Sequence, residues 1–179
     1  MEPTKIHSRF PSPKNPTPTD PSLSSVAQRR TAERMVLNRL LWKTGPLHHR
    51  LYAYKEGIGT QECLADVMST INERKAIVVF LDLEKAYELA SAAAILEALA
   101  DKAVKGNLLA WAKGYTQNRQ ARVTFQGASS DFLSLENGTP QGGILSPFLF
   151  NVLMEKLATT TLPNGVEIFI YADDVCLVS

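Results

Sequence analysis

Residues 168–178 read Ile-Phe-Ile-Tyr-Ala-Asp-Asp-Val-Cys-Leu-Val, and the four at the centre are Tyr171-Ala172-Asp173-Asp174. Both apolar flanks are rich in β-branched and aromatic residues, so the stretch predicts two strands joined by a tight connection at Ala172 and Asp173. The resulting hairpin carries two adjacent carboxylates at its tip. Like charges beside apolar strands either stay in solvent or are neutralised by a cation. On this stretch alone, a solvated acidic turn and a cation site both remain open.

Length and composition place this hairpin in a globular chain. With 179 residues and 45% hydrophobic content, the sequence supports one substantial core, or one domain plus a tail. The only cysteines, Cys63 and Cys176, lie in apolar segments, which indicates neither a disulfide framework nor a cysteine metal site. No apolar run approaches the roughly 18 to 20 residues that span a bilayer, and the N-terminus lacks the apolar core of a secretory signal. We therefore expect an intracellular protein without membrane association.

The first part of the chain predicts a tail. Residues 1–21 contain six of the ten prolines and no hydrophobic periodicity, so residues 1–24 are expected to be extended or disordered. A helix is predicted from Ser25, which with Gln28 resembles a capping box, to Gly45-Pro46. Its apolar side consists of Ala32, Val36, Leu37, Leu40 and Leu41.

The same predicted helix is strongly basic. From residue 28 to residue 55 there are seven Lys or Arg residues against one Glu. The basic residues of the helix are Arg29, Arg30, Arg34, Arg39 and Lys43. They are either nucleic-acid-binding residues or a solvated helix face, and the charge pattern does not choose between these interpretations.

The middle of the chain places a further carboxylate at the end of a strand. A helix capped by Thr60 is predicted to bury Leu64, Val67, Met68 and Ile71 along one face. Residues 76–81 then form a continuous apolar run, which predicts a strand buried on both faces. It ends at Asp82. A carboxylate at the end of a buried strand suggests a ligand site, because burying an unpaired charge costs several kcal/mol.

The remaining segments complete an α+β pattern. Two helices are predicted, at residues 91–102 and from near Asn107, followed by a hairpin of residues 122–126 and 131–136 around a Gly-Ala-Ser-Ser turn. A loop with three glycines follows at 138–143, and then a helix with Ser146 as N-cap and Pro147 at its first position. Segregated antiparallel hairpins and helices indicate an α+β fold.

Antiparallel pairing of the 76–81 strand with the 168–178 hairpin brings together Asp82, Asp173 and Asp174. Hard carboxylate ligands select Mg²⁺ or Mn²⁺, and a two-metal site is the usual device for in-line phosphoryl transfer. Successive side chains of a strand point to opposite faces, so a turn or bulge is needed for both Asp173 and Asp174 to reach the same ions. This geometry favours Asp173 over Asp174.

Three ordered motifs resemble the palm motifs of reverse transcriptases of non-LTR retrotransposons. They are Phe80-Leu81-Asp82-Leu83-Glu84-Lys85-Ala86-Tyr87, Gly138-Thr139-Pro140-Gln141-Gly142-Gly143-Ile144-Leu145-Ser146-Pro147 with Leu149-Phe150-Asn151, and Tyr171-Ala172-Asp173-Asp174. The resemblance runs from about Thr31 to the last residue. It implies a right-hand polymerase palm with a split β-α-β, ferredoxin-like core at about 76–179, and partial helical fingers at about 25–75.

The resemblance also implies an activity and the residues that carry it. The reaction is attack of a DNA primer 3′-hydroxyl on a deoxynucleoside triphosphate, copied from an RNA template, with Asp82, Asp173 and Asp174 holding Mg²⁺ or Mn²⁺. Tyr87 matches the aromatic residue that rejects a ribose 2′-hydroxyl, although a core aromatic is the alternative. Gln141 and Gly142, with Pro140, match the loop at the template and nascent base pair. Lys55 is equally compatible with a triphosphate contact and a solvated lysine.

Departures from the family pattern leave activity open. Glu88 stands where many relatives have Asp, basic residues of the fingers loop are replaced around Gly57-Ile58-Gly59, and the chain is expected to lack a thumb. A strand that normally follows the hairpin is also expected to be missing, which would leave the 76–81 strand with an open apolar edge. The alternative function is therefore an inactive retrotransposon-derived remnant that at most binds nucleic acid weakly.

Overall fold

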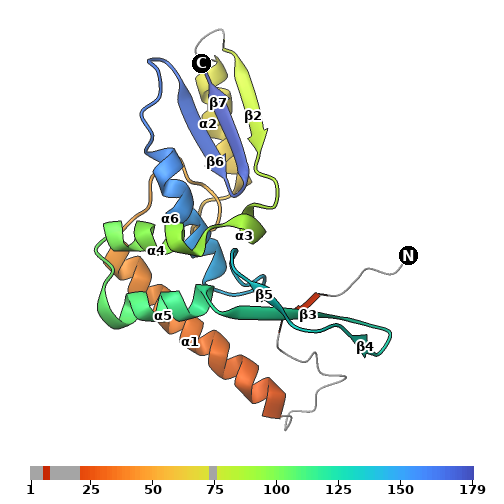
Figure 1. Cartoon of the computed structure of the whole chain (residues 1–179). Coiled ribbons are helices and arrows are strands. Elements are labelled where there is room, and N and C mark those ends of the chain that lie inside the picture. The colour runs from red at the N-terminus through yellow and green to blue at the C-terminus, as the bar shows by residue number, and fades with distance from the viewer. Residues whose placement is uncertain (1–5, 9–20, 73–75) are drawn as a thin grey trace.

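The computed structural model describes residues 6–8, 21–72 and 76–179 and consists of helices around two small antiparallel sheets (Figure 1). The helices are α1 (Pro21–Thr44), α2 (Thr60–Asn72), α3 (Ala86–Leu89), α4 (Ala92–Asp101), α5 (Gly106–Thr116) and α6 (Ser146–Ala158). The strands are β1 (Ile6–Ser8), β2 (Val78–Asp82), β3 (Arg119–Phe125), β4 (Ala128–Ser129), β5 (Leu133–Leu135), β6 (Glu167–Tyr171) and β7 (Asp174–Val178). This mixture confirms the helix-and-hairpin pattern of the sequence.

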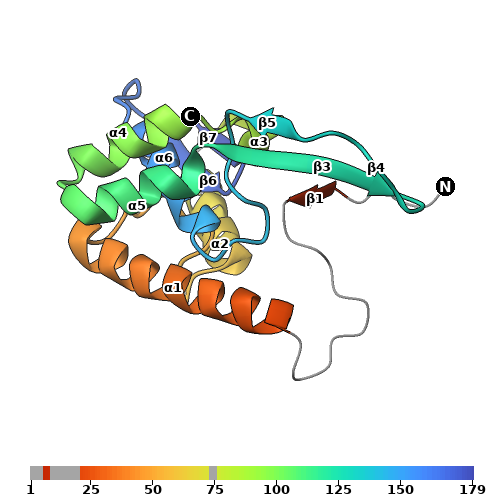
Figure 2. The same cartoon turned by 60° about the horizontal axis from the view of Figure 1, so that its bottom comes forward.

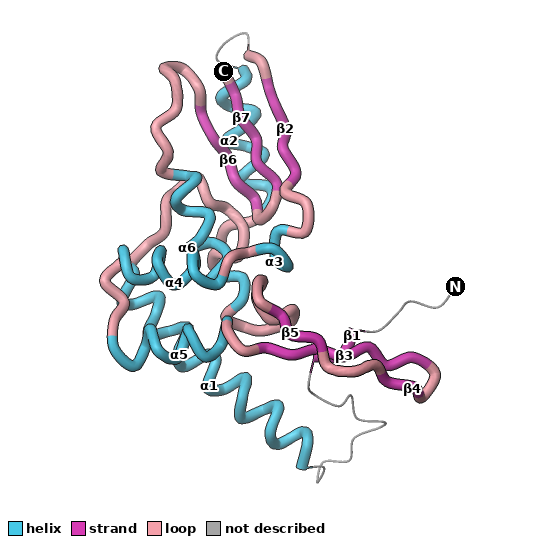
Figure 3. The backbone as a smooth tube through the Cα atoms, in the orientation of Figure 1, coloured by secondary structure: helices cyan, strands magenta, loops and turns pink. Residues whose placement is uncertain are grey.

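The sheet that carries the acidic hairpin has the order β2-β7-β6. Alternate residues of its strands enter two different cores, as the period of two in a strand requires. Ile168, Ile170 and Val175 belong to a large core with α6, whereas Phe169 and Cys176 pack with α2. The sheet therefore lies between α2 and α6, with the ends of β2 and of the hairpin turn on the side of α3 (Figure 3).

Strand β2 corrects the expectation of a strand buried on both faces. It pairs with β7 in the register Val78↔Val178 to Asp82↔Asp174, and among the residues described no strand pairs with its other edge. Only Val78 packs against the core beside α2, so Phe80 is 75% exposed and Val79 and Leu81 are also exposed. The apolar run still predicted the strand, and the open apolar edge expected for it is present.

The opposite edge of the sheet is covered by the loop that follows α1. Leu51 bridges Ile170 in parallel, and the Tyr52 amide donates to the Ile170 carbonyl at 2.9 Å. Arg50 pairs with Glu167 and places its guanidinium over the Phe169 ring at 4.3 Å from the ring centre. These contacts attach the segment after α1 to β6.

The second sheet is built on β3, which runs on from α5 and extends away from the helices (Figure 2). Strand β3 pairs with β5 and β4, which confirms the predicted hairpin, but its turn is at Gln126 and Gly127, and Ala128–Ser129 of the expected turn are strand β4. Strand β1 also pairs with β3, Ile6 opposite Val123. Part of the expected tail is thus an added strand, while residues 1–5 and 9–20 lie outside the described part of the chain.

Helices α4, α5 and α6 pack together on the α6 side of the sheet, and the boundaries of the helices differ from the sequence prediction in detail. Helix α4 packs against both α5 and α6, and the core between them includes Leu99 and Leu149. Helix α1 begins at Pro21 rather than Ser25, because proline has the backbone angle of a first helical turn and needs no amide partner there. In α2 only Val67 is buried, while Leu64 (61%) and Met68 are exposed because the sheet covers one side of the helix.

Within the described residues, no helix is long and apolar enough to cross a membrane.

Candidate active site

The acidic turn lies directly beside the end of β2. Ala172 occupies the turn with φ of +56°, an uncommon conformation for a residue with a Cβ, and Asp173 follows it before β7 begins at Asp174. Antiparallel register pairs Asp82 with Asp174, so these two side chains share one face of the sheet. The Leu83 amide donates to the Asp173 carbonyl at 3.3 Å, which extends the pairing into the turn.

The three carboxylates are close in the backbone but have no compensating charge. Asp82 and Asp174 are exposed and Asp173 is half-buried, and no ion pair joins any of them to a described Lys or Arg. Asp173 is in the turn, so it is Asp174 that lies directly across from Asp82. Among the described residues, no three acidic, His or Cys side chains are arranged closely enough to hold a metal ion. The two strands therefore meet as predicted, but the three carboxylate side chains do not come close enough together to share an ion.

Tyr87 lies next to this acidic turn. Its ring stacks on Phe150 at 4.5 Å and meets Tyr54 edge-on at 6.3 Å, so it is half-buried in the large core. Its hydroxyl is buried, and no described group lies in hydrogen-bonding geometry with it. Burial raises the pKa of Tyr87 well above its ordinary value, and the Tyr54 hydroxyl and the Asp173 charge raise the pKa further. The Tyr87 ring is thus both a core aromatic and a neighbour of Asp173.

The glycine loop is attached to the segment that carries Tyr87. The Gly138 amide donates to the Ala90 carbonyl at 2.7 Å, and the Thr139 amide donates to the Tyr87 carbonyl at 3.0 Å. A Cβ at Gly138 would lie 2.7 Å from the carbonyl oxygens of Tyr87 and Glu88, and φ here is +86°. Only glycine fits this close approach. The first glycine of the loop therefore fixes the loop against α3.

Beyond this attachment the loop turns back on itself. The Pro140 carbonyl accepts from the Gly143 amide at 3.1 Å and from the Ser146 hydroxyl at 2.6 Å. Ser146 is therefore the first residue of α6 and a brace for the loop, not the predicted N-cap. Gln141 and Gly142 are exposed at the tip, where Gly142 has φ of +77°. The tip is free to meet a ligand.

A buried carboxylate on α1 also holds the loop, and the sequence did not single it out. Glu33 is 1% exposed, and its Oε2 accepts from the Ile144 amide at 2.7 Å and from the Tyr115 hydroxyl at 3.4 Å. Its Oε1 lies 3.5 Å from Nε of Arg29. Glu33 is the single acidic residue in the basic segment 28–55, and that isolation was the one available signal.

Two other polar side chains brace the site. Arg119 at the start of β3 donates to the carbonyls of Asn137 and Gly138, the latter at 2.9 Å. Asn151 of α6 is buried and donates to the Ala53 carbonyl at 2.7 Å, which fixes the segment that carries Tyr54. Asn151 could have been identified from the sequence, because it is a polar residue on the apolar side of a predicted helix. No sequence pattern indicates the role of Arg119.

The predicted basic residues divide into two groups. The Lys55 amine donates to the His48 carbonyl at 2.7 Å, and burial lowers its pKa. No ion pair between described residues joins Lys55 to the acidic turn. Arg29 is half-buried beside Glu33 and has a structural role. The other basic residues of α1 are exposed, and they are Arg30, Arg34, Arg39 and Lys43.

Comparison with known sequences matches residues 22–179 to the family described as Reverse transcriptase (RNA-dependent DNA polymerase). The RNA-directed DNA polymerase from mobile element jockey of Drosophila melanogaster is 27% identical over 177 residues, which span 92% of this chain and 19% of that protein. The Pol polyprotein from type-1 retrotransposable element R2 of Nasonia vitripennis is 26% identical over 186 residues, or 93% of this chain and 18% of that protein. The chain thus spans about a fifth of the length of these relatives.

Among solved structures, apo telomerase from Candida tropicalis, truncated from its C-terminal domain, resembles this chain with a TM-score of 0.58. The two share 14% sequence identity, and the match covers 86% of this chain and 34% of that one. At this low sequence identity, the similarity shows a shared fold and nothing more.

Proposed function

Because the chain belongs to the reverse transcriptase (RNA-dependent DNA polymerase) family, we propose that it carries the catalytic palm of an RNA-directed DNA polymerase. Its substrates are an RNA template, a DNA primer and deoxynucleoside triphosphates. The observation that carries the proposal is the pairing of Asp82 with Asp174 beside the turn that holds Asp173. In this assignment residues 76–179 are the palm, with the split β-α-β arrangement, and residues 25–75 belong to the fingers.

The acidic turn suits Mg²⁺ or Mn²⁺ by its chemistry. Asp82, Asp173 and Asp174 offer only hard oxygen donors, the ligand type that these ions prefer, and they lie at one end of the sheet. When bound, the ions activate the primer hydroxyl and neutralise charge that develops on the phosphates. The exposed positions of Asp82 and Asp174 leave these side chains free to reorient toward an ion.

The chain's own residues bind and orient the nucleotide. Tyr87 is held by Phe150 and by the Gly138 loop, so its ring is a fixed wall beside Asp173. We assign this wall to the sugar, where its bulk excludes a ribose 2′-hydroxyl. The exposed tip at Gln141 and Gly142, supported by Pro140, is assigned to the nascent base pair. The Lys55 amine already donates hydrogen bonds to carbonyls of the loop after α1. We therefore propose that Lys55 acts on the triphosphate indirectly, by holding this loop in place.

Primer extension on an RNA template tests the assignment of the carboxylates. Asp82→Asn, Asp173→Asn and Asp174→Asn are each expected to lower Mg²⁺-dependent extension by about 100-fold or more, because each removes a charge that holds the ions. Asp131→Asn is the matched control, since Asp131 is an exposed carboxylate of the β4–β5 connection. Extension that survives in all three site variants would refute the assignment. Retention of RNA without any extension by the unsubstituted chain would support the inactive remnant instead.

Nucleotide selection tests the assignment of Tyr87. Tyr87→Ala opens the space next to the sugar, so incorporation of ribonucleotides relative to deoxynucleotides is expected to rise. Tyr87→Phe keeps the ring and removes only the buried hydroxyl, so discrimination should stay as in the unsubstituted chain. Equal discrimination by both variants would leave Tyr87 with a packing role only.

A further inference from the structure

A pocket of about 590 Å³ opens between α1 and the beginning of α5, away from the acidic turn. Its lining includes both tryptophans of the chain, Trp42 and Trp111, and three cations, Arg39, Lys43 and Lys105. The other lining residues are Val36, Asn107 and Leu108, so none is acidic. Helices α4 and α6 lie between α5 and the β2-β7-β6 sheet, which separates the pocket from the catalytic carboxylates.

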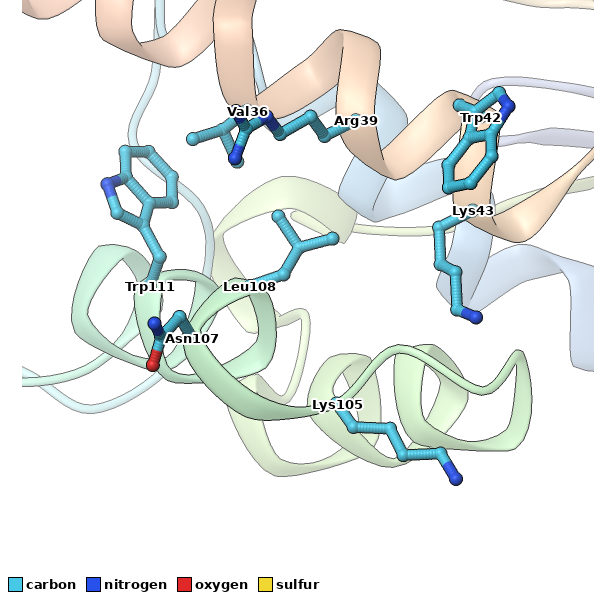
Figure 4. A pocket seen from close by; sticks show the side chains of 8 residues that line it. All are labelled: Val36, Arg39, Trp42, Lys43, Lys105, Asn107, Leu108 and Trp111. Carbon is cyan, nitrogen blue, oxygen red and sulfur yellow. The ribbon is translucent and has the colours of Figure 1, made fainter.

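The two indoles offer different surfaces to a ligand. Trp42 is 86% exposed, which is unusual for the largest apolar side chain, whereas Trp111 is half-buried and stacks on Tyr115 at 5.3 Å. In Figure 4 the two indoles lie on either side of Leu108. Exposing an indole to water without a partner is unfavourable, since its flat apolar faces gain from stacking on another ring. Trp42 is therefore available to stack on a ligand.

The cations of the pocket are equally available. Arg39 and Lys43 are four residues apart and therefore lie on one face of α1, and Lys105 lines the pocket from the start of α5. No ion pair links any of the three to a described Asp or Glu. The three uncompensated charges attract an anion, and the pocket volume is in the range that holds a small ligand or one residue of a polymer.

We propose that this pocket binds single-stranded nucleic acid, with one base stacked on Trp42 and adjacent phosphates at Arg39, Lys43 and Lys105. A single strand repeats a negative charge and a flat ring along one chain, and this combination fits three cations around an exposed indole. Duplex nucleic acid satisfies the cations but keeps its bases stacked inside. An acidic protein segment would also satisfy the charges, yet it carries no ring beside each charge.

Both tryptophans line the pocket, so tryptophan emission, excited selectively over that of the five tyrosines, comes from indoles at this site. Titration with a 12-nucleotide oligo(dT) is expected to quench the fluorescence in a saturable way. Trp111→Phe leaves Trp42 as the only indole and should keep the quenching. An abasic oligonucleotide of the same length has the charge without the bases and should bind about tenfold more weakly.

Substitutions separate stacking from charge, with affinity followed by anisotropy of a labelled oligonucleotide. Trp42→Ala should weaken oligo(dT) binding about tenfold and abolish the preference over the abasic strand, without loss of folding because the side chain is exposed. Lys43→Gln and Lys105→Gln should each reduce the salt dependence of log K by about 0.7. Lys113→Gln, an exposed lysine of α5 that does not line the pocket, is the matched control and should change nothing.

Three results would overturn the proposal: equal binding of the abasic strand, unchanged affinity in Trp42→Ala, or displacement of oligo(dT) by an acidic peptide that binds more tightly. The last result would identify a protein contact. The test is independent of polymerase activity, since Asp173→Asn is expected to bind oligo(dT) at the pocket like the unsubstituted chain. Loss of extension and loss of pocket binding can therefore be told apart.

Discussion

The Glu33 carboxylate of α1 accepts a 2.7 Å hydrogen bond from the Ile144 amide, 111 residues later in the chain. Through this bond the basic helix and the glycine loop form one unit. Tyr115 joins them by donating to the same oxygen of Glu33 and by contacting the Ser146 hydroxyl at 3.1 Å. The position of the loop over the candidate site therefore depends on a side chain far from the acidic turn.

Replacing Glu33 should loosen this unit. Glu33→Ala leaves the Ile144 amide without this acceptor and limits the Tyr115 hydroxyl to its contact with Ser146, so we expect a loss of about 2 kcal/mol in the free energy of unfolding, measured by urea denaturation. Glu33→Gln keeps one acceptor oxygen and should lose less. Arg34→Ala, at the exposed neighbouring position, serves as control. A similar loss in the control and in Glu33→Ala would contradict the assigned role.

Substitution of Gly138 should show how much stability is lost through the close contact of a Cβ and how much through the positive φ alone. In Gly138→Ala the new Cβ meets two backbone carbonyls at 2.7 Å in a left-handed conformation, so we expect a loss of about 3 kcal/mol in unfolding free energy. Gly127→Ala is the control because Gly127 has nearly the same φ, +85°, with nothing within 4 Å of the added Cβ. Gly127→Ala should lose about 1 kcal/mol in unfolding free energy, measured by urea denaturation. Equal losses in the two variants would show that the close contact at Gly138 adds no destabilisation.

The stability of the chain should fall in alkaline solution because of Tyr52. Burial, and next the hydrogen bond to Asp66 at 2.7 Å, raise the pKa of Tyr52 to about 12. In the unfolded chain tyrosine ionises near pH 10, so between pH 10 and 12 only the unfolded state loses this proton. The stabilising contribution is complete below pH 10 and is lost as the pH rises toward 12. Tyr52→Phe should show a smaller fall in the urea midpoint between pH 9 and 11, and an unchanged fall would exclude Tyr52 as its source.

The exposed apolar edge should cause self-association. Phe80→Lys places a charge on β2 where the side chain is 75% exposed, so the unfolding free energy should change by about 0.5 kcal/mol or less while association falls. Sedimentation velocity measures the change. Ser134→Lys adds the same charge to the exposed strand β5 and should leave association as it was. If both variants behave alike, net charge and not the β2 edge governs association.

Local patterns predicted the elements of the site correctly. The Ile168–Val178 hairpin with its turn at Ala172 and Asp173, the strand ending at Asp82 and the existence of a helix at Ser146-Pro147 are confirmed, and so is the resemblance to non-LTR reverse transcriptases. Each depends on neighbouring residues, whose spacing fixes the local structure. The role of each carboxylate toward a metal stays a prediction.

The burial of individual side chains could not be predicted from the sequence, because it depends on which elements pack against each other. The apolar run before Asp82 was expected to be buried on both faces, and this was wrong because burial depends on the elements that cover a strand and not on its composition. For the same reason Leu64 and Met68 are exposed on an amphipathic helix. Glu33 looks in the sequence like an ordinary helical acid, and only the arrival of the Ile144 amide makes it a buried brace.

The edge position of β2 also bears on how firmly Asp82 is held. A strand inside a sheet is fixed by hydrogen bonds on two sides, whereas β2 has a ladder with β7 alone among the described strands. Fraying of this one ladder would move Asp82 away from Asp174 without unfolding the rest of the molecule. The alignment of the candidate metal ligands therefore depends on a single ladder, and any strand that docks on the free edge would tighten it.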